Sequence, residues 1–254
     1  MKSLMTPGRI FFAIAMACFG IHFLTYASGA AAAPPGPPWI PGRPLWAYLW
    51  GAGLILASAS IATKKKANCA GIALGIALFL LAVLVYIPRL AANVHSPAPW
   101  TSGFELLAMC GGALVFAGLS QSSGFHFPGS PGRTIALGQY LFAISLIVFG
   151  TQHFLYARFI ATLIPAWIPG HLFWAYFVGV AFFATALAII FRTGAVRATS
   201  LLGLMFLLWV VLLHLPRVAA SPHNGNEWTS AFVALAMSGS ALALAGTFAT
   251  KLRN

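Results

Sequence analysis

The sequence predicts an all-α integral membrane protein with eight transmembrane helices, arranged as two parallel-repeat four-helix bundles. Composition is the first reason, because 60% of the 254 residues are hydrophobic and only 6% are charged, with a mean hydropathy of +0.90. A soluble domain carries roughly 25% charged residues, so this chain lacks the side chains for a surface that faces water. The second reason is an internal repeat that divides the chain into two similar halves.

The repeat is carried by separate segments that share one offset of 128 residues. Its matched pairs are Trp39–Tyr48 with Trp167–Tyr176, Pro88-Arg89 with Pro216-Arg217, His95 with His223, and Trp100–Gly118 with Trp228–Gly246. Repeats define the units of a fold and have to be found before its elements are assigned. This one predicts a first unit at residues 1–122, a cytoplasmic linker at 123–132 and a second unit at 133–254.

Each unit contains four apolar segments that can cross a bilayer, which takes ~20 helical residues at 1.5 Å of rise per residue. We expect helices near Ile10–Ala27, Leu45–Thr63, Cys69–Ile87, Trp100–Gly118, Leu137–Ala157, Phe173–Phe191, Ser200–Leu215 and Trp228–Ala249. Because four is an even number, both units enter the membrane from the same side. They should be related by an axis along the membrane normal.

The first segment also imitates a secretory signal, because a basic start precedes an apolar run and the small residues from Ser28 to Ala33. The corresponding segment of the second unit is internal and cannot be a signal. We therefore expect residues 10–27 to be the first membrane helix.

The basic residues predict the orientation. Of the 14 Lys and Arg residues, ten lie on the side of the termini and four on the other side, so both termini are expected in the cytoplasm. Orientation in the bilayer also explains the net charge of +12 better than a nucleic-acid partner does. Every repeated motif then falls on the outer side.

Two segments, Ser28–Pro44 and Arg158–Gly170, are too polar or too rich in proline to span the membrane. We expect each to cap the outer mouth of its unit, because irregular backbone must be covered by protein or lie at the interface. The tryptophans in and beside these caps are Trp39, Trp46, Trp167 and Trp174. They fit an aromatic belt at the headgroup level or the wall of a pocket, and one indole can serve both.

Ionisable side chains are costly inside membrane helices and usually face the bundle interior. His22 and His153 fall in the outer half of the bilayer, and we align them as counterparts with a one-residue slip. His214 and Glu105 lie nearer the outer helix ends. Each of these groups either lines a cavity or makes a hydrogen bond that only fixes helix packing.

Arg89 and Arg217 each follow a proline at the outer end of a helix. They can snorkel to the headgroups or take part in a site. Glu105 could neutralise Arg89, but the counterpart of Glu105 in the second unit is Val233. The two units are therefore not chemically equivalent.

Several catalytic patterns are absent from the sequence, among them a Gly-rich phosphate loop, HExxH and Gly-x-Ser-x-Gly. Two acidic residues, far apart, give no carboxylate pair for acid–base catalysis. Cys18, Cys69 and Cys110 show no paired spacing, which predicts neither disulfides nor a cysteine metal site. The histidines do not form the cluster of a catalytic metal, although two could act as axial haem ligands.

Three stretches of the second unit resemble the DoxX-like family of small bacterial membrane proteins, four-helix units similar to the DoxD subunit of thiosulfate:quinone oxidoreductase. They are Gly150–Phe154, Pro165–Pro169 and Phe173–Tyr176. The resemblance covers both halves and implies a tandem DoxX-like protein in the bacterial inner membrane. The first unit departs from the pattern, with Gly20-Ile21-His22-Phe23 and a cap rich in alanine and proline.

Three hypotheses for function compete. The first is a redox-associated protein whose outer-leaflet cavities hold a quinone-like lipophilic molecule, with Trp and Phe against its ring and His, Tyr and Arg at its oxygens. The second is a non-catalytic structural or assembly subunit of a larger membrane complex, whose loops dock a periplasmic partner. Transport is weaker, because the sequence shows no mid-helix Gly or Pro break of the kind that discontinuous helices supply.

We predict that the second unit holds the better-formed site, beneath the Arg158–Gly170 cap. There, polar groups from several helices lie at the same depth in the membrane within an apolar wall, as in a small-molecule site. Its residues are His153, Tyr156, Trp167, Trp174, His214 and Arg217. The candidates of the first unit are His22, Tyr26, Trp39, Trp46, Arg89 and Glu105. The alternative is a belt of the same residues facing lipid, and the direction of their side chains separates the two.

Overall fold

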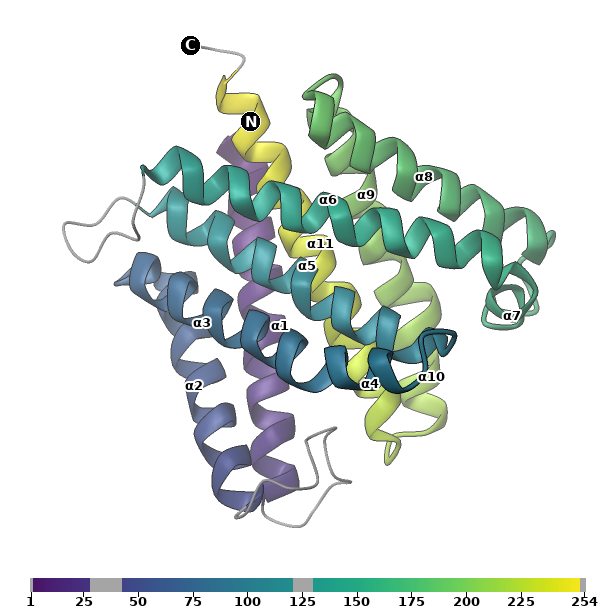
Figure 1. Ribbon diagram of the computed structural model, residues 1–254, viewed down its shortest axis with the longest axis horizontal. Helices are drawn as coiled ribbons and strands as arrows, with labels where there is room; N and C mark the ends of the chain where they lie inside the picture. Colours follow the sequence, from purple (N-terminus) through teal and green to yellow (C-terminus); the bar gives the residue numbers. More distant parts are fainter. Residues whose placement is uncertain (1, 28–42, 121–129, 252–254) are drawn as a thin grey trace.

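The computed structural model describes residues 2–27, 43–120 and 130–251, and all regular structure within these ranges is helical (Figure 1). Eight helices among the described residues are long and apolar enough to cross a membrane. The all-helical fold class expected from the sequence is confirmed, and the protein is a multi-pass helical membrane protein. The predicted linker at 123–132 falls largely outside the described residues.

The two repeats have the same order of elements. The first contains α1 (Lys2–Ala27), α2 (Arg43–Thr63), α3 (Ala67–Leu81), η1 (Ala82–Tyr86), α4 (Ile87–Ala92) and α5 (Pro97–Leu119). The second contains α6 (Pro131–Leu155), α7 (Ala157–Thr162), α8 (His171–Phe191), α9 (Ala195–Trp209), η2 (Val210–His214), α10 (Leu215–Ala220) and α11 (Gly225–Lys251). From the start of α2 to the start of α5, every boundary recurs 128 residues later. The repeat seen in the sequence is thus also a repeat of structure.

The third long helix of each repeat extends past the point where we expected it to end. The spans run from Ala67 to Ala92 and from Ala195 to Ala220, so Pro88 and Pro216 lie inside them. Proline lacks a backbone N–H and clashes with the carbonyl four residues earlier. A π-turn, η1 or η2, directly precedes each proline segment and widens the helix there. Both prolines lie near the ends of these spans and not at their middle.

The repeats pack crosswise. α1 packs most closely against α2 and α11, and α6 against α8 and α5, while α5 and α11 contact each other. The first helix of each repeat therefore lies against the last helix of the other repeat, and the two four-helix units share these walls.

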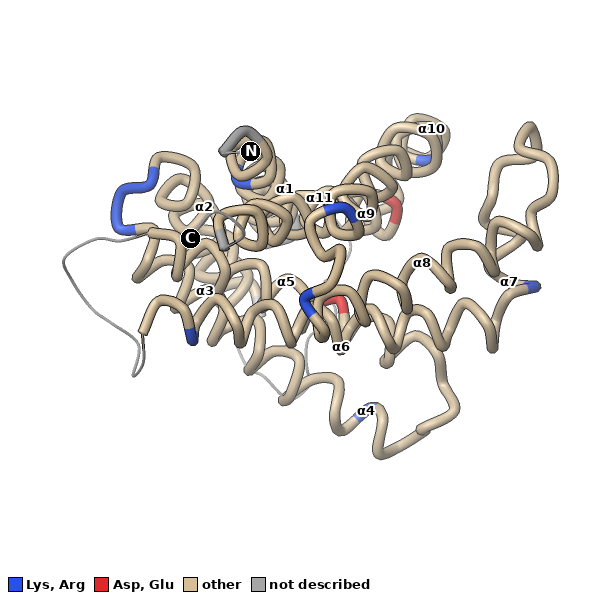
Figure 2. The backbone as a smooth tube through the Cα atoms, turned by 90° about the horizontal axis from the view of Figure 1, so that it is seen from above, with Lys and Arg blue, Asp and Glu red and all other residues tan. Residues whose placement is uncertain are grey.

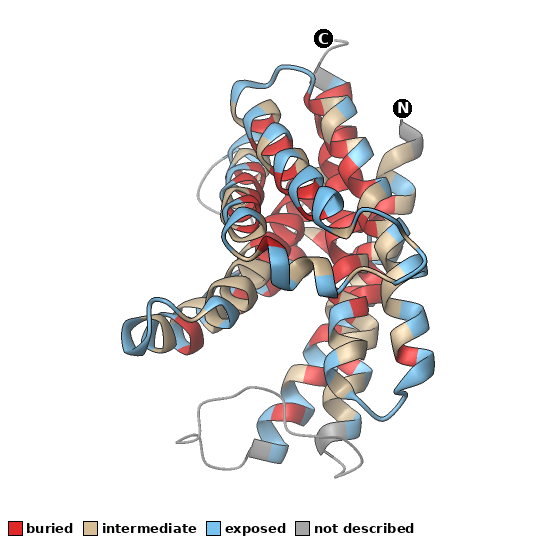
Figure 3. Ribbon diagram, turned by 90° about the vertical axis from the view of Figure 1, so that its right-hand side faces the viewer, coloured by how far each residue is buried: buried red, intermediate tan, exposed pale blue. Residues whose placement is uncertain are grey.

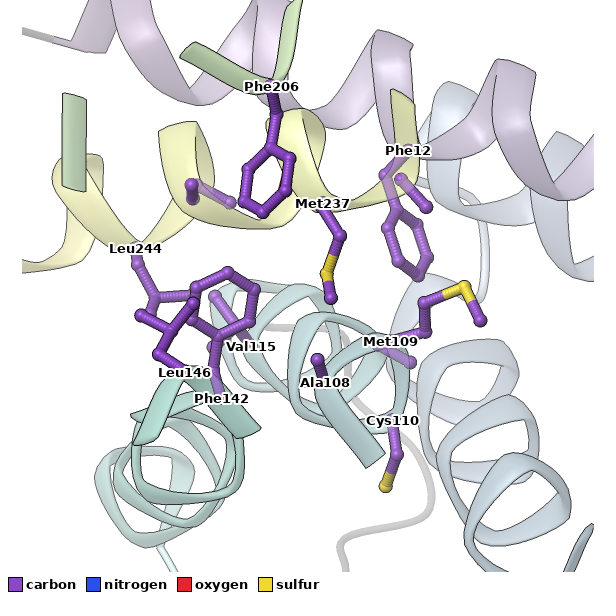
Figure 4. Close-up of a cluster of buried hydrophobic side chains, with 14 of the residues drawn as sticks. Phe12, Ala108, Met109, Cys110, Val115, Phe142, Leu146, Phe206, Met237 and Leu244 are labelled. Atoms are coloured by element: carbon purple, nitrogen blue, oxygen red, sulfur yellow. The ribbon is translucent and has the colours of Figure 1, made fainter. Parts of the chain in front are cut away.

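The core lies around α5 and α11, where buried residues are concentrated in Figure 3. Figure 4 shows Phe142 and Leu146 of α6 beside Leu244 of α11, with Phe12 of α1 facing the other side of the cluster. Phe12 and Phe142 are both completely buried. Large apolar side chains also cover the outside, among them Leu56, Leu155 and Phe191. In a membrane protein such a surface faces lipid.

The start of α1 and the end of α11 lie at the same end of the molecule, as an even number of spans requires (Figure 1). Met5 near the start of α1 packs against Gly246 near the end of α11. The turn Lys64–Lys66 is the longest continuous basic stretch in Figure 2, between α2 and α3. The placement of this end in the cytoplasm stays a prediction from the charge asymmetry.

Candidate functional site

Two cavities open between the helices toward the end of the molecule that is remote from the termini. The larger cavity, of about 790 Å³, lies mainly in the second repeat, and the smaller cavity, of about 370 Å³, lies mainly in the first. Ligand sites for small molecules typically measure about 300–1,000 Å³, so both volumes fall in this range.

The six residues predicted for the second repeat all border the larger cavity. They are His153, Tyr156, Trp167, Trp174, His214 and Arg217. Trp167 is also 67% exposed, so its indole contributes to the cavity wall and to the outer surface. These side chains meet around one space, and their role in binding stays a prediction.

His153 is held in one orientation at the end of α6. Its Nδ1 lies 2.8 Å from the Phe149 carbonyl oxygen. A carbonyl can only accept, so Nδ1 carries the proton of the neutral ring and Nε2 is left as an acceptor. The ring stacks on Trp209, with centroids 6.5 Å apart, and meets the edge of Phe182 at 5.1 Å. The wall thus presents a fixed hydrogen-bond acceptor among aromatic rings.

The π-turn of the second repeat places His214 at the cavity. His214 is the last residue of η2, and its Nδ1 is buried without a hydrogen-bond partner among the described residues. Arg217 lies one turn further and donates a hydrogen bond to the Leu163 carbonyl. A guanidinium has five N–H donors, so this contact leaves others for a ligand. π-turns are frequent at functional sites.

The cap of the second repeat consists of α7 and the turn that follows it. Gly170 ends the Trp-Ile-Pro-Gly motif with φ = 72°, a conformation that suits glycine. Trp174 then donates from Nε1 to the Pro169 carbonyl at 3.1 Å. Together with the Arg217–Leu163 hydrogen bond, this contact fastens the cap over the cavity. The corresponding cap of the first repeat, with Trp39, lies outside the described residues, as does the side chain of Tyr26.

The first repeat contributes part of the wall of the larger cavity. Gln152 of α6 donates from Nε2 to the Pro97 carbonyl at 3.0 Å, and Thr101 donates to its Oε1 at 3.1 Å. All three residues border the cavity. Sequence reasoning missed Gln152, because its role depends on a contact between the repeats.

The structure corrects the alignment of His22 with His153. Gly20 of α1 lies against Ile55, and Gly150 of α6 lies against Phe183, which is the counterpart of Ile55. Gly20 and Gly150 are therefore equivalent. Two residues further along each helix, His22 is equivalent to Gln152 and not to His153. The neighbouring residues support this equivalence. His22 lies against Gly225, which is the counterpart of Pro97, and Pro97 is the hydrogen-bond partner of Gln152.

The candidates of the first repeat are only partly brought together. His22 and Glu105 border the smaller cavity, whereas Trp46 and Arg89 do not. The guanidinium carbon of Arg89 lies 5.3 Å from the centre of the Tyr86 ring. Among the described residues no ion pair joins Arg89 to Glu105, so the possible neutralisation of Arg89 by Glu105 is not seen there.

Tyr86 is a further residue of the smaller cavity that sequence reasoning missed. It ends η1 as His214 ends η2, and it is hydrogen-bonded to Ser102. The offset of 128 residues pairs Tyr86 with His214 and was a signal that could have found it.

No protein-family model, curated protein or solved structure matches this chain. The resemblance to the DoxX-like family therefore stays a prediction. Within the described ranges, no three His, Cys, Asp or Glu side chains are grouped closely enough to hold a metal ion.

Glu105 occupies a special position, because it borders both cavities. Its counterpart Val233 also borders both. These two positions of α5 and α11 form the partition between the cavities, and only one of them carries a charge.

Proposed function

We propose that this membrane protein binds a lipophilic molecule with a flat ring and hydrogen-bonding oxygens, of the quinone type, in the larger cavity. One observation carries the proposal. A single space brings a stacked aromatic wall together with a fixed acceptor at His153 and with donor groups at His214 and Arg217. The proposal concerns binding and leaves turnover open.

The wall suits a planar apolar ring. Phe149, Phe182 and Trp209 form a connected group, with ring centroids 5.9 Å apart for the first pair and 6.1 Å for the second. Aromatic side chains contribute large apolar area and prefer edge or offset contacts with another ring. A ligand between Trp209 and Trp174 would be covered on both faces by residues that border the cavity.

The polar groups suit both redox forms of such a ligand. The carbonyl oxygens of a quinone only accept hydrogen bonds, and Arg217 has N–H groups to donate. The hydroxyl groups of the reduced quinol also donate, and His153 Nε2 accepts. His214 can serve either form, because its Nδ1 has no other partner among the described residues. The resemblance to the DoxX-like family supports a redox association, and the predicted orientation would place the cavity in the outer leaflet.

The proposal is tested by ligand content and by titration. The purified protein is extracted with organic solvent, and the extract is examined by absorption spectroscopy for a quinone. The protein in lipid nanodiscs is then titrated with decylubiquinone and decylubiquinol, with tryptophan fluorescence as readout. We expect saturable quenching, because Trp167, Trp174 and Trp209 border the cavity.

A matched pair of variants tests the role of His153. His153→Phe keeps an aromatic ring and removes the acceptor, and should weaken quinol binding by roughly tenfold, the effect of one hydrogen bond of about 1.4 kcal/mol. His171→Phe replaces a histidine that does not border the cavity and should leave binding unchanged. Absence of saturable quenching, or equal affinity in both variants, would refute the proposal. A structural subunit would then be the better explanation, and stoichiometric partners should co-purify in mild detergent.

A further inference from the structure

The smaller cavity differs from the larger one in the polar groups of its wall. Where the larger cavity has the basic pair His214 and Arg217, the smaller has the phenol Tyr86, and Arg89 lies outside its wall. In the smaller cavity Glu105 provides the only acidic group among the described wall residues. The duplicated site has therefore kept its position and lost the arginine from its wall.

Glu105 has no partner among the residues that the structure describes. It lies eight residues after the start of α5, about 12 Å along the helix axis. Within the described ranges its carboxyl group makes no ion pair and no hydrogen bond. An ionisable group inside a membrane protein is costly and is usually matched by a partner of opposite charge or by a ligand. The nearby Arg89 does not supply that charge, because its guanidinium lies over the Tyr86 ring.

Aromatic side chains surround the space next to this carboxylate. Phe19, Phe23, Trp50 and Tyr86 all border it. Phe23 and Trp50 meet edge to face, with centroids 6.4 Å apart and an angle of 73° between the rings. Ring faces attract cations, and cages of several aromatic rings recognise quaternary ammonium groups. The wall therefore favours a cation whose charge is spread over alkyl groups.

The mouth of the smaller cavity is polar. It is bordered by His22, by the loop residues His223 and Asn224, and by Asn226 in the first turn of α11. The His22 ring lies close to Gly225, where an added Cβ would be 3.2 Å from its Cε1. These groups come from the end of the bundle remote from the termini, so a charged ligand can approach without first crossing an apolar wall.

We propose that the smaller cavity is a second binding site, for a small alkylated ammonium cation, with Glu105 as its counter-charge and Trp50, Phe23 and Tyr86 as its aromatic wall. A free cation and the choline headgroup of a lipid share this chemistry. The site takes a different kind of ligand from the larger cavity, and its wall shares only Glu105 and Val233 with that cavity.

The test compares choline with its neutral carbon isostere, dimethylbutanol, by isothermal titration calorimetry in dodecyl maltoside micelles. The two probes have nearly the same shape, so a difference in affinity reports the charge. We expect choline to bind at least roughly tenfold more tightly, as a cation–π contact plus a counter-charge predicts. Equal affinities for the two probes would overturn the proposal without any variant.

Two glutamate variants locate the counter-charge. Glu105→Gln keeps the size of the side chain and should abolish the preference for choline. Glu227→Gln removes the other acidic residue, which does not border the cavity, and should keep the preference. A preference that survives in Glu105→Gln would refute the assignment. Phosphatidylcholine added to the micelles displaces choline if the site takes a lipid headgroup, and lack of displacement identifies a free cation as ligand.

Discussion

Gly111 of α5 and Gly138 of α6 touch backbone to backbone, since a Cβ added to Gly111 would lie 2.5 Å from the Gly138 carbonyl oxygen. The equivalent crossing of α1 and α11 has the same contact, with an added Cβ on Gly239 at 2.6 Å from the Gly8 carbonyl oxygen. Small residues let membrane helices approach closely. Such close packing matters in a bilayer, because the hydrophobic effect does not drive helices together there. These two crossings join the first helix of each repeat to the last helix of the other.

A methyl group at this crossing should destabilise the protein. Gly111→Ala forces α5 and α6 apart, and we expect a loss of about 1–3 kcal/mol, the usual effect of overpacking. Gly53→Ala is the matched control, because an added Cβ on Gly53 of α2 meets nothing within 4 Å. It should be neutral or stabilise slightly, since alanine favours helix over glycine. Thermal unfolding in detergent measures both, and equal midpoints would contradict the crosswise packing.

A buried hydrogen bond between Gln139 and Thr247 should link α6 to α11. Gln139 Nε2 donates to Thr247 Oγ1 at 2.9 Å, and both side chains are buried. Thr247→Val should destabilise by about 0.6–1.7 kcal/mol, as hydrogen bonds between membrane helices do. Thr185→Val is the control, because that buried hydroxyl bonds only within its own helix. In a double-mutant cycle with Gln139→Leu, additive effects would show that the bond contributes nothing.

Loss of Arg217 should loosen the cap. Arg217→Met removes the hydrogen bond to the Leu163 carbonyl and should speed amide hydrogen exchange in the segment that follows Leu163. Arg158→Met removes an exposed arginine of the cap itself and should leave exchange unchanged. Arg217→Lys should restore part of the protection, because lysine also donates. Unchanged exchange in Arg217→Met would mean that packing alone holds the cap.

The orientation predicted from the basic residues can be tested by labelling. In a variant without native cysteines, Lys65→Cys should resist an impermeant thiol reagent in intact cells, because the turn between α2 and α3 is expected in the cytoplasm. Ser221→Cys lies at the other end of the molecule, after α10, and should be labelled. The reverse pattern would invert the topology and place the cavities in the inner leaflet.

The position of the larger cavity could be predicted because depth in a membrane follows from the helical rise. His153, Trp167 and Arg217 are expected at one level from their distance to helix ends, and all three border one cavity. Such counting works for residues near a boundary that the sequence marks, such as the Trp-Ile-Pro-Gly turn.

Features that depend on rotation or on the choice of neighbour could not be predicted in the same way. The equivalence of His22 and Gln152 requires the register of α1 against α2, which only the contacts of Gly20 and Gly150 reveal. The crosswise packing was not foreseen either, because an apolar helix surface suits lipid and protein equally. The π-turn that presents Tyr86 leaves no signature in hydrophobicity, and Pro88 suggested a helix end instead of a wider turn.

The partition between the two cavities has a consequence for how such a protein can be assembled. If two identical single-repeat chains formed the same crosswise structure, each residue would occur on both sides of the partition, so a glutamate there would face a second glutamate. In the joined chain, Glu105 and Val233 both border the two cavities, and one carboxylate stands where symmetry would impose two. Covalent fusion thus permits a charge pattern that a homodimer cannot have, and it fixes one copy of each cavity in every molecule.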